Sequence, residues 1–271
     1  MAVTLSAGVR ASLSAISQAS ANAQTAQLRL ATGKKVNSAL DNATNYFTSE
    51  GLKGRASDLN TLLDSMGQGI KVAEAASKGI DGITKLVQTA KGLANAAKQT
   101  SDTTARAAYA AQYDDIRQQI TDMAADSGYN GTNLIKATAD DLSVKFSEAD
   151  SARELTIDGV DLDSAGLALT AAAGSWATDA NIDTDLGLVS TALTKLRTTA
   201  ASFGANVTIL QARQDFTKSM IDTLNNGADA LVLADSNEEG ANLLAAQTRG
   251  QLAQTALSLA SQADQAVLRL F

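Results

Sequence analysis

Residues 28–46 of the chain read Leu-Arg-Leu-Ala-Thr-Gly-Lys-Lys-Val-Asn-Ser-Ala-Leu-Asp-Asn-Ala-Thr-Asn-Tyr, and this segment separates two long stretches of helical periodicity. Within it, Gly33 can take the left-handed backbone conformation that commonly ends a helix. The two lysines that follow Gly33 suit the negative end of a helix dipole. From the pattern alone, the segment is a loop between helices. It therefore predicts a joint between two layers of helices.

An apolar stripe precedes this joint and predicts a first helix over residues 1–32. Its members recur at alternating steps of three and four residues, which is typical of an amphipathic helix with one apolar face. Because the stripe is rich in alanine and serine, such a helix is marginal in water and needs a partner helix. The stripe consists of Leu5, Val9, Ser12, Ile16, Ala19, Ala23, Ala26 and Leu30.

Two apolar lines predict a second helix over residues 52–97. Its several glycines either weaken it or let neighbours approach its backbone closely. A third helix is predicted over residues 105–126, with Ser101 or Asp102 as its N-cap and an Asn-Gly turn signal beyond its end. It should fold back antiparallel on the second. In the second helix, one apolar line consists of Leu59, Met66, Ala73, Ile80, Val87 and Ala94, and the other consists of Leu62, Gly69, Ala76, Ile83, Ala90 and Ala97.

The middle of the chain changes to a period of two residues. Apolar residues alternate with polar ones at Leu142, Val144 and Phe146 and again at Leu155 and Ile157, which predicts a short β-hairpin. The following segment, residues 161–184, has no clear pattern. Heptad spacing returns over residues 186–231, and a break is expected at residues 235–240. A last helix is predicted over residues 241–270, with Ala245, Leu252, Leu259 and Ala266 spaced seven apart.

The composition excludes several classes of function. The chain has no proline, which permits very long uninterrupted helices. It has no histidine and no cysteine, so the commonest general base, every thiol nucleophile and most transition-metal ligands are missing. Paired acids such as Asp114 and Asp115 are interpreted as solvated helix faces. We therefore expect no enzyme activity, no cofactor and no metal.

The net charge of −7 argues against nucleic acid as a partner, because phosphate binding needs clustered basic residues. No apolar run approaches the roughly 20 residues that span a bilayer. A membrane-active amphipathic protein would need polar faces rich in lysine and arginine, and these are absent. The N-terminus also lacks the basic and apolar regions of a cleaved secretory signal. We expect neither a nucleic-acid nor a membrane partner.

The segment at residues 28–46 resembles the N-terminal signature of bacterial flagellins. Two positions depart from that signature, because Asn42 stands where the family has an acid and Asn45 where it has glycine. Asparagine tolerates positive φ, so the second change need not alter the backbone. The first puts in doubt any salt link through that acid. The matching residues are Arg29, Leu30, Gly33, Asn37, Ser38, Ala39, Asp41 and Ala43.

Two later segments are also similar to flagellins. Tyr129, Asn130, Gly131 and Leu134 resemble a turn motif of that family. Residues 258–262 and 267–271 resemble the flagellin C-terminus, although the family's proline before the ending is missing. The apolar ending would be awkward in a free monomer, and a subunit interface is a natural place for it.

The resemblance implies a mainly α protein, a long antiparallel helical bundle or coiled-coil hairpin with a small β-hairpin inserted in the middle. Residues 1–40 with 232–271 would form an inner layer of terminal helices. Residues 41–135 with 185–231 would form a helical rod, and residues 136–184 a short variable insertion. The implied function is a structural subunit of the extracellular flagellar filament used for swimming. The alternative is a hook–filament junction protein, which shares the terminal helices.

The resemblance also implies partners and a site. The chain would polymerise with copies of itself, and it would meet the flagellar export apparatus and the cap and junction proteins. It would leave the cell through the flagellar channel without a cleaved signal. A zinc-peptidase insertion, known in some flagellins, is excluded because it needs histidine. The residues expected to carry self-assembly are Leu5, Val9, Ile16, Arg29, Leu30, Asn37, Asp41, Leu252, Leu259, Val267, Leu268, Leu270 and Phe271.

Overall fold

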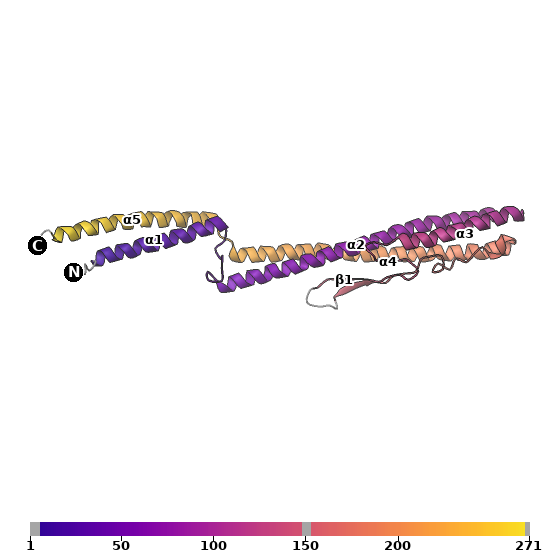
Figure 1. Ribbon diagram of the computed structural model, residues 1–271, viewed down its shortest axis with the longest axis horizontal. Coiled ribbons are helices and arrows are strands. Elements are labelled where there is room, and N and C mark those ends of the chain that lie inside the picture. Colours follow the sequence, from indigo (N-terminus) through magenta and orange to yellow (C-terminus); the bar gives the residue numbers. More distant parts are fainter. Residues whose placement is uncertain (1–5, 148–152, 269–271) are drawn as a thin grey trace. The chain divides into compact units, whose positions relative to one another are not determined.

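The computed structural model describes residues 6–147 and 153–268, apart from the side chains of residues 267 and 268. Long helices dominate it, and one small antiparallel hairpin lies in the middle of the chain (Figure 1), which confirms the predicted fold class. The elements are α1 (Ala7–Thr32), α2 (Ala43–Lys98), α3 (Thr103–Asp126), β1 (Leu142–Lys145), β2 (Glu154–Ile157), the 3-10 helix η1 (Ala173–Trp176), α4 (Asp179–Val232) and α5 (Ser236–Leu268).

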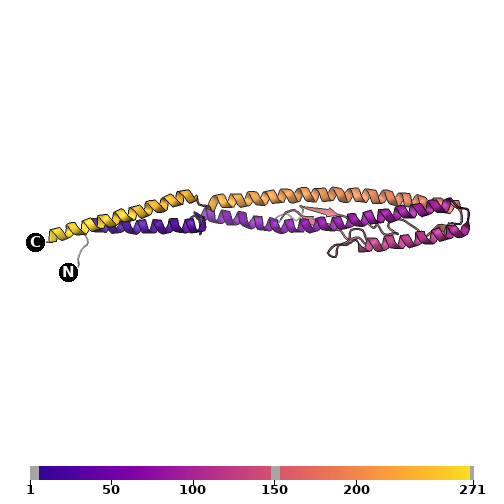
Figure 2. The ribbon, with the colours of Figure 1, turned by 90° about the horizontal axis from the view of Figure 1, so that it is seen from above.

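The chain forms two compact units, and α2 and α4 each contribute to both. The first unit comprises Met1–Ala56 and Asp222–Phe271, and the second comprises Ser57–Ile221. In the second unit α2, α3 and α4 lie side by side (Figures 1 and 2), with α3 running back along α2. The two apolar lines predicted for the second helix are buried there, apart from Leu62, which is half-buried.

Three glycines of α2 mark places where neighbouring groups pack against its bare backbone. A Cβ at Gly69 would lie 2.6 Å from a methyl carbon of Val144 in β1. A Cβ at Gly79 would lie 2.6 Å from the Cβ of Ser127 and 2.7 Å from Cδ1 of Ile135. At Gly82 it would collide with the sulfur of Met123 in α3. These glycines therefore let the hairpin, α3 and the loop after α3 approach α2 closely.

The C-terminal end of α3 is organised by Asn133, a buried residue that the sequence analysis did not single out. Its side-chain nitrogen donates to the carbonyls of Ala124 and Ala125 at 2.8 and 2.9 Å. Its side-chain oxygen accepts from the backbone N–H groups of Ile135 and Lys136 at 2.9 and 3.1 Å. Asn133 thus supplies partners for carbonyls that the helix end leaves open.

The hairpin forms from the two segments predicted for it, with Phe146 just beyond the end of β1. Leu142 pairs with Ile157 and Val144 with Leu155, and Val144 and Ile157 are buried. The guanidinium of Arg213 in α4 lies over the Phe146 ring, 5.1 Å from its centroid, a favourable cation–π distance. The hairpin region therefore contacts α4 through Phe146 as well as α2 through Val144.

The segment before α4 contains a short left-handed turn that the sequence did not reveal. Gly174, Ser175 and Trp176 all have positive φ, which is unfavourable for the two residues that carry side chains. The turn buries the Trp176 ring completely, and its indole N–H donates to the buried Asp185 carboxylate at 2.6 Å. Burial, with the nearby Asp185 charge, also raises the pKa of Tyr113, whose ring lies 5.1 Å from that of Trp176.

Three helix boundaries were predicted wrongly, and capping explains two of them. The second helix begins at Ala43 rather than residue 52, because Asn42 accepts from the backbone N–H of Asn45 at 3.0 Å and caps it. Asn45 therefore lies in a helix and has no positive φ. The last helix begins at Ser236 rather than residue 241, because Asp235 accepts from the N–H of Asn237 at 2.8 Å. The fourth begins at Asp179 rather than residue 186.

Candidate self-assembly surface

In the first unit, α1 and α5 pack along each other through small residues. Ala19 and Ala26 of α1 and Ala246 and Ala253 of α5 are the buried apolar residues between them. A Cβ at Gly250 would lie 3.7 Å from the Cβ of Ala19, so the helices are in contact with very little side chain between them. The stripe predicted for the first helix faces this contact, and its described members are buried or half-buried.

The joint after α1 pairs with the joint before α5. The N–H of Lys35 donates to the carbonyl of Val232 at 2.7 Å, and the N–H of Ala234 donates to the carbonyl of Gly33 at 2.9 Å. Gly33 caps α1 in the left-handed conformation, with φ of 67°, as predicted. The two loops therefore form one hydrogen-bonded connection.

A charged pair closes the same joint. The guanidinium of Arg29 lies 2.9 Å from a carboxylate oxygen of Glu239, and the Glu239 side chain is 8% exposed. Glu239 belongs to the first turn of α5, where a carboxylate also favours the positive end of the helix dipole. Asn42 does not take part in this pair, so the family acid that it replaces is not needed for this link.

Asp41 organises the loop between α1 and α2. One of its oxygens accepts from the backbone N–H groups of Asn37 and Ser38, both at 2.9 Å. The Asn37 side chain donates to the carbonyl of Lys34 at 3.0 Å. These backbone bonds favour the ionised carboxylate and lower the pKa of Asp41, with a smaller contribution from the Arg29 charge. Asn37 and Asp41 therefore hold the loop in one conformation.

A ridge of leucines lies on α5 on the face turned away from α1. Leu244 and Leu252 are each 66% exposed, and Leu259 is 62% exposed. With 3.6 residues per turn, the three leucines lie within about 80° of one another around the helix and about 100° or more from Ala246 and Ala253, so they share one broad face outside the contact with α1. We call these three residues the leucine ridge. Exposed large aliphatic side chains grouped on one face are a general feature of protein interaction surfaces.

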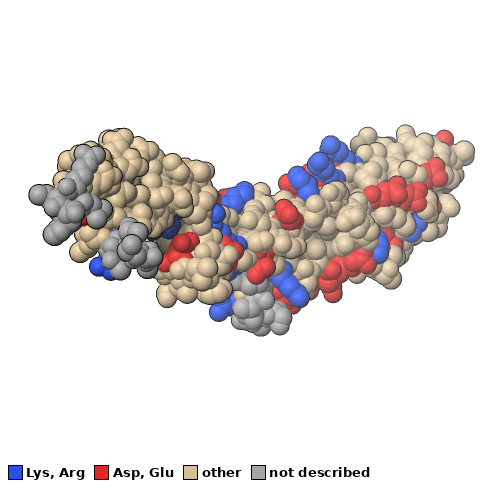
Figure 3. Space-filling view, turned by 60° about the vertical axis from the view of Figure 1, so that its left-hand side comes forward, with Lys and Arg blue, Asp and Glu red and all other residues tan. Residues whose placement is uncertain are grey.

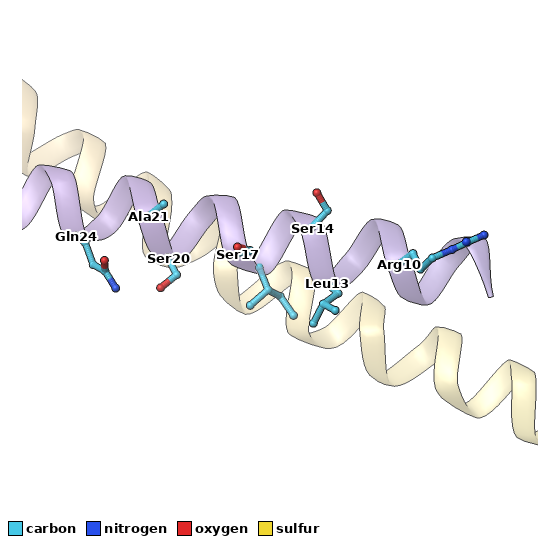
Figure 4. Close-up of a pocket in the computed structure, with 8 residues that line it drawn as sticks. Arg10, Leu13, Ser14, Ser17, Ser20, Ala21 and Gln24 are labelled. Atoms are coloured by element: carbon cyan, nitrogen blue, oxygen red, sulfur yellow. The ribbon is translucent and has the colours of Figure 1, made fainter. Parts of the chain in front are cut away.

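A shallow open groove of about 780 Å³ follows a different face, on α1. Figure 4 shows its labelled residues along α1, with the α5 ribbon beside it. Small side chains form most of its floor, and Leu13, which is 53% exposed, adds an apolar wall. We call it the α1 groove. It is lined by Arg10, Leu13, Ser14, Ile16, Ser17, Ser20, Ala21 and Gln24.

The two helices carry very little charge. Only Arg10 and Arg29 are charged among the 26 residues of α1. Four of the 33 residues of α5 are charged, two of them in its first turn. In Figure 3 the surface next to the grey terminal residues is largely tan, whereas red and blue gather elsewhere. A helix pair with both a buried seam and a sparsely charged outer surface is suited to burial on more than one side.

The residues predicted to carry self-assembly fall into separate places. Val9, Ile16 and Leu30 share the α1 stripe that faces α5, and Arg29, Asn37 and Asp41 lie in the joint. Leu252 and Leu259 belong to the leucine ridge. Leu5, Leu270 and Phe271 lie outside the described residues, as do the side chains of Val267 and Leu268. Their roles in assembly stay predictions.

Sequence reasoning missed Leu244 and Leu13, which the structure exposes in the ridge and the groove. The eight-residue step from Leu244 to Leu252 could have revealed the former, because residues i and i+8 can belong to the same apolar stripe of a helix. In the described part of the chain, no helix is long and apolar enough to cross a membrane. Residues 6–147 and 153–268 also contain no group of three or more acidic side chains arranged to hold a metal ion.

These features define a protein of paired long helices that expose large apolar side chains on their outer faces. Comparison with known proteins identifies the family. Residues 7–140 match the bacterial flagellin N-terminal helical region, and residues 186–271 match the bacterial flagellin C-terminal helical region. The chain belongs to the bacterial flagellins.

Two relatives from Caulobacter vibrioides agree with this assignment. The chain is 33% identical to flagellin FljM and 32% identical to flagellin FljO of Caulobacter vibrioides, in each case over 99% of this chain and 98% of the relative. A crystal structure of Bacillus cereus flagellin is similar to 58% of this chain and 88% of its own, with 20% identity and a TM-score of 0.48. The protein is therefore a structural subunit of the extracellular flagellar filament, and the hook–filament junction alternative is not favoured.

Proposed function

We propose that the chain polymerises by seating the leucine ridge of one copy in the α1 groove of another. The observation that carries this proposal is the presence of two unlike surfaces on one helix pair: a ridge of large apolar side chains, and a groove with serine and alanine along it and Arg10 as its single charged residue. Because the two surfaces differ, the contact is head-to-tail. A head-to-tail contact whose rotation does not close generates an open helical filament, whereas a self-complementary patch would give a closed dimer.

The ridge can supply a useful share of the assembly energy. Complete burial of a leucine side chain is worth about 1.5–3 kcal/mol, and roughly two thirds of each ridge side chain is still exposed in the monomer. Burying all three would contribute about 3–6 kcal/mol for each contact. Losing one leucine should then raise the critical concentration for polymerisation about tenfold, since 1.4 kcal/mol corresponds to a factor of ten.

The same proposal includes the other partners of a filament subunit and an absence of catalysis. Family membership supports contacts with the export apparatus and with the cap and junction proteins. The chain carries neither histidine nor cysteine, which supports a purely structural role. Pull-down with purified cap and junction proteins tests the first part, and no binding to either would contradict it.

Sedimentation after seeding tests the ridge directly. The double variant Leu252→Ser and Leu259→Ser should keep the monomer's helix content, because both side chains are exposed, and should need at least about tenfold more protein to form filaments. The matched control is Ile209→Ser, which removes an exposed aliphatic side chain from α4 in the second unit and should assemble normally. Assembly of the double variant at the wild-type critical concentration would contradict the proposal.

A further inference from the structure

The turn that follows α3 presents an Asn-Gly pair to solvent. Tyr129 and Thr132 exchange two backbone hydrogen bonds of 2.9 and 3.1 Å, which leaves Asn130 and Gly131 as the two central residues. Both are exposed, and both have positive φ, of 49° and 85°. No atom lies within 4 Å of the place that a Cβ would take at Gly131. The space around Gly131 is therefore open.

The two groups that could react with each other are both unrestrained. Among the described residues, neither the Asn130 side chain nor the Gly131 N–H has a hydrogen-bond partner. In a helix or a paired strand position that N–H would be bonded to a carbonyl. Here the backbone nitrogen and the side-chain carbonyl carbon can approach without either group losing a bond. Glycine, having no side chain, also leaves the path of approach open.

We propose that Asn130 is a modification site at which the side-chain amide is lost spontaneously. The Gly131 backbone nitrogen attacks Cγ of Asn130, a new N–Cγ bond forms, and the Cγ–Nδ2 bond breaks. Nδ2 leaves as ammonia and takes up the proton that the Gly131 nitrogen loses. Water then opens the five-membered imide at either carbonyl, so that an aspartate or an isoaspartate stands at position 130. The sequence of steps consumes one water and needs no other reactant.

A second Asn-Gly pair in the same chain provides an internal control. Asn226 and Gly227 lie within α4, and Asn226 is also exposed. As an internal residue of the helix, Gly227 uses its N–H in the hydrogen-bond ladder. Reaction at Asn226 therefore requires local opening of α4, whereas reaction at Asn130 does not. The two sites have the same residue pair and an exposed asparagine, and they differ in backbone restraint.

The modification would alter a groove next to the turn. Asn130 lines a groove of about 360 Å³ together with Leu62 and Val72 of α2 and Leu142 and Lys145 of β1. Either product places a negative charge on this wall. The isoaspartate also adds a carbon atom to the backbone between Tyr129 and Thr132, so their two hydrogen bonds cannot both be kept. As the modified fraction of the protein increases with time, the shape and charge of this groove therefore change.

Peptide mass spectrometry tests the proposal on the full-length monomer. Native and fully denatured protein are incubated side by side at mildly alkaline pH, and the deamidated fraction is measured at both asparagines. The native protein should react at Asn130 at least about tenfold faster than at Asn226, and denaturation should bring the two rates together. The variant Asn130→Gln should lose the signal at position 130 and keep that at Asn226.

Two results would overturn the proposal. One is a native protein in which Asn130 stays intact while the denatured protein reacts there, because the turn would then protect the amide. The other is equal reaction at Asn130 and Asn226 in the native protein, because backbone restraint would then not decide the site. Circular dichroism of the incubated native sample checks that it stayed folded during the measurement.

Discussion

Two glycines of the same helix allow the packing of the second unit to be measured with a single type of substitution. Gly79 and Gly92 both lie inside α2, and alanine is favoured over glycine in a helix by up to about 1 kcal/mol. At Gly92 no atom lies within 4 Å of the added Cβ, so Gly92→Ala should stabilise the protein by about 1 kcal/mol.

At Gly79 the new Cβ would lie 2.6 Å from the Ser127 Cβ and 2.7 Å from Cδ1 of Ile135. Ser127 cannot turn aside freely, because its hydroxyl donates to the carbonyl of Met123 at 2.6 Å. Overpacking typically costs about 1–3 kcal/mol, and two carbon contacts below 3 Å place this site in the upper part of that range, about 2–3 kcal/mol, which outweighs the gain in helix propensity. Gly79→Ala should therefore destabilise the protein by about 1–2 kcal/mol. The free energies of unfolding of the two variants should then differ by about 2–3 kcal/mol.

Thermal unfolding followed by tryptophan fluorescence is a suitable assay. Trp176 is the only tryptophan, and it is buried in the second unit, so its emission reports on that unit. The two variants should differ in Tm by roughly 4–12 °C, since 1 kcal/mol shifts Tm by about 2–4 °C in a chain of this size. Equal stabilisation by both substitutions would refute close packing at Gly79.

Two further predictions concern single side chains. Asn133→Ala should lower the free energy of unfolding by about 2–4 kcal/mol, because two α3 carbonyls and two loop N–H groups lose their side-chain partner. Urea unfolding measures this free energy, and a decrease of less than about 0.5 kcal/mol would contradict the capping role of Asn133. The pKa of Asp41 is lower in the folded protein than in the unfolded chain, where it is about 3.9. The ionised carboxylate therefore stabilises the folded loop at pH values above about 3.9, and this stabilisation is lost as the pH falls through the lower folded pKa. Wild type and Asp41→Asn should therefore differ in stability at neutral pH and converge in strong acid, and a difference independent of pH would contradict this.

Hydrophobic periodicity predicted the buried faces of the first two helices, because the apolar stripes of these helices are also their buried faces. The α1 stripe and both α2 lines face their partners as expected. In α5 the two properties diverge. The heptad line through Leu252 and Leu259 is exposed, while Ala246, Gly250 and Ala253 face α1. Close approach of two helices selects small residues at the contact, so the largest apolar side chains are left on the outside.

The remaining features depend on contacts that a linear pattern does not contain. The roles of Asn133 and Asp185 arise from hydrogen bonds made around helix ends and a left-handed turn. The Asn37 and Asp41 motif was visible in the sequence, but its local function in the loop became clear only from its backbone partners. For the surface, the ridge residues were partly predicted, whereas half of the residues that line the α1 groove are serine or alanine, which no hydrophobic pattern marks.

Electron cryo-microscopy of filaments grown from the purified chain tests most directly whether the protein assembles through its ridge and groove. The account predicts a continuous helical filament in which Leu244, Leu252 and Leu259 of one copy lie against Leu13, Ser17 and Ser20 on α1 of a neighbouring copy. A filament in which these three leucines contact no neighbouring copy, or contact only the α5 of a neighbour, would contradict it.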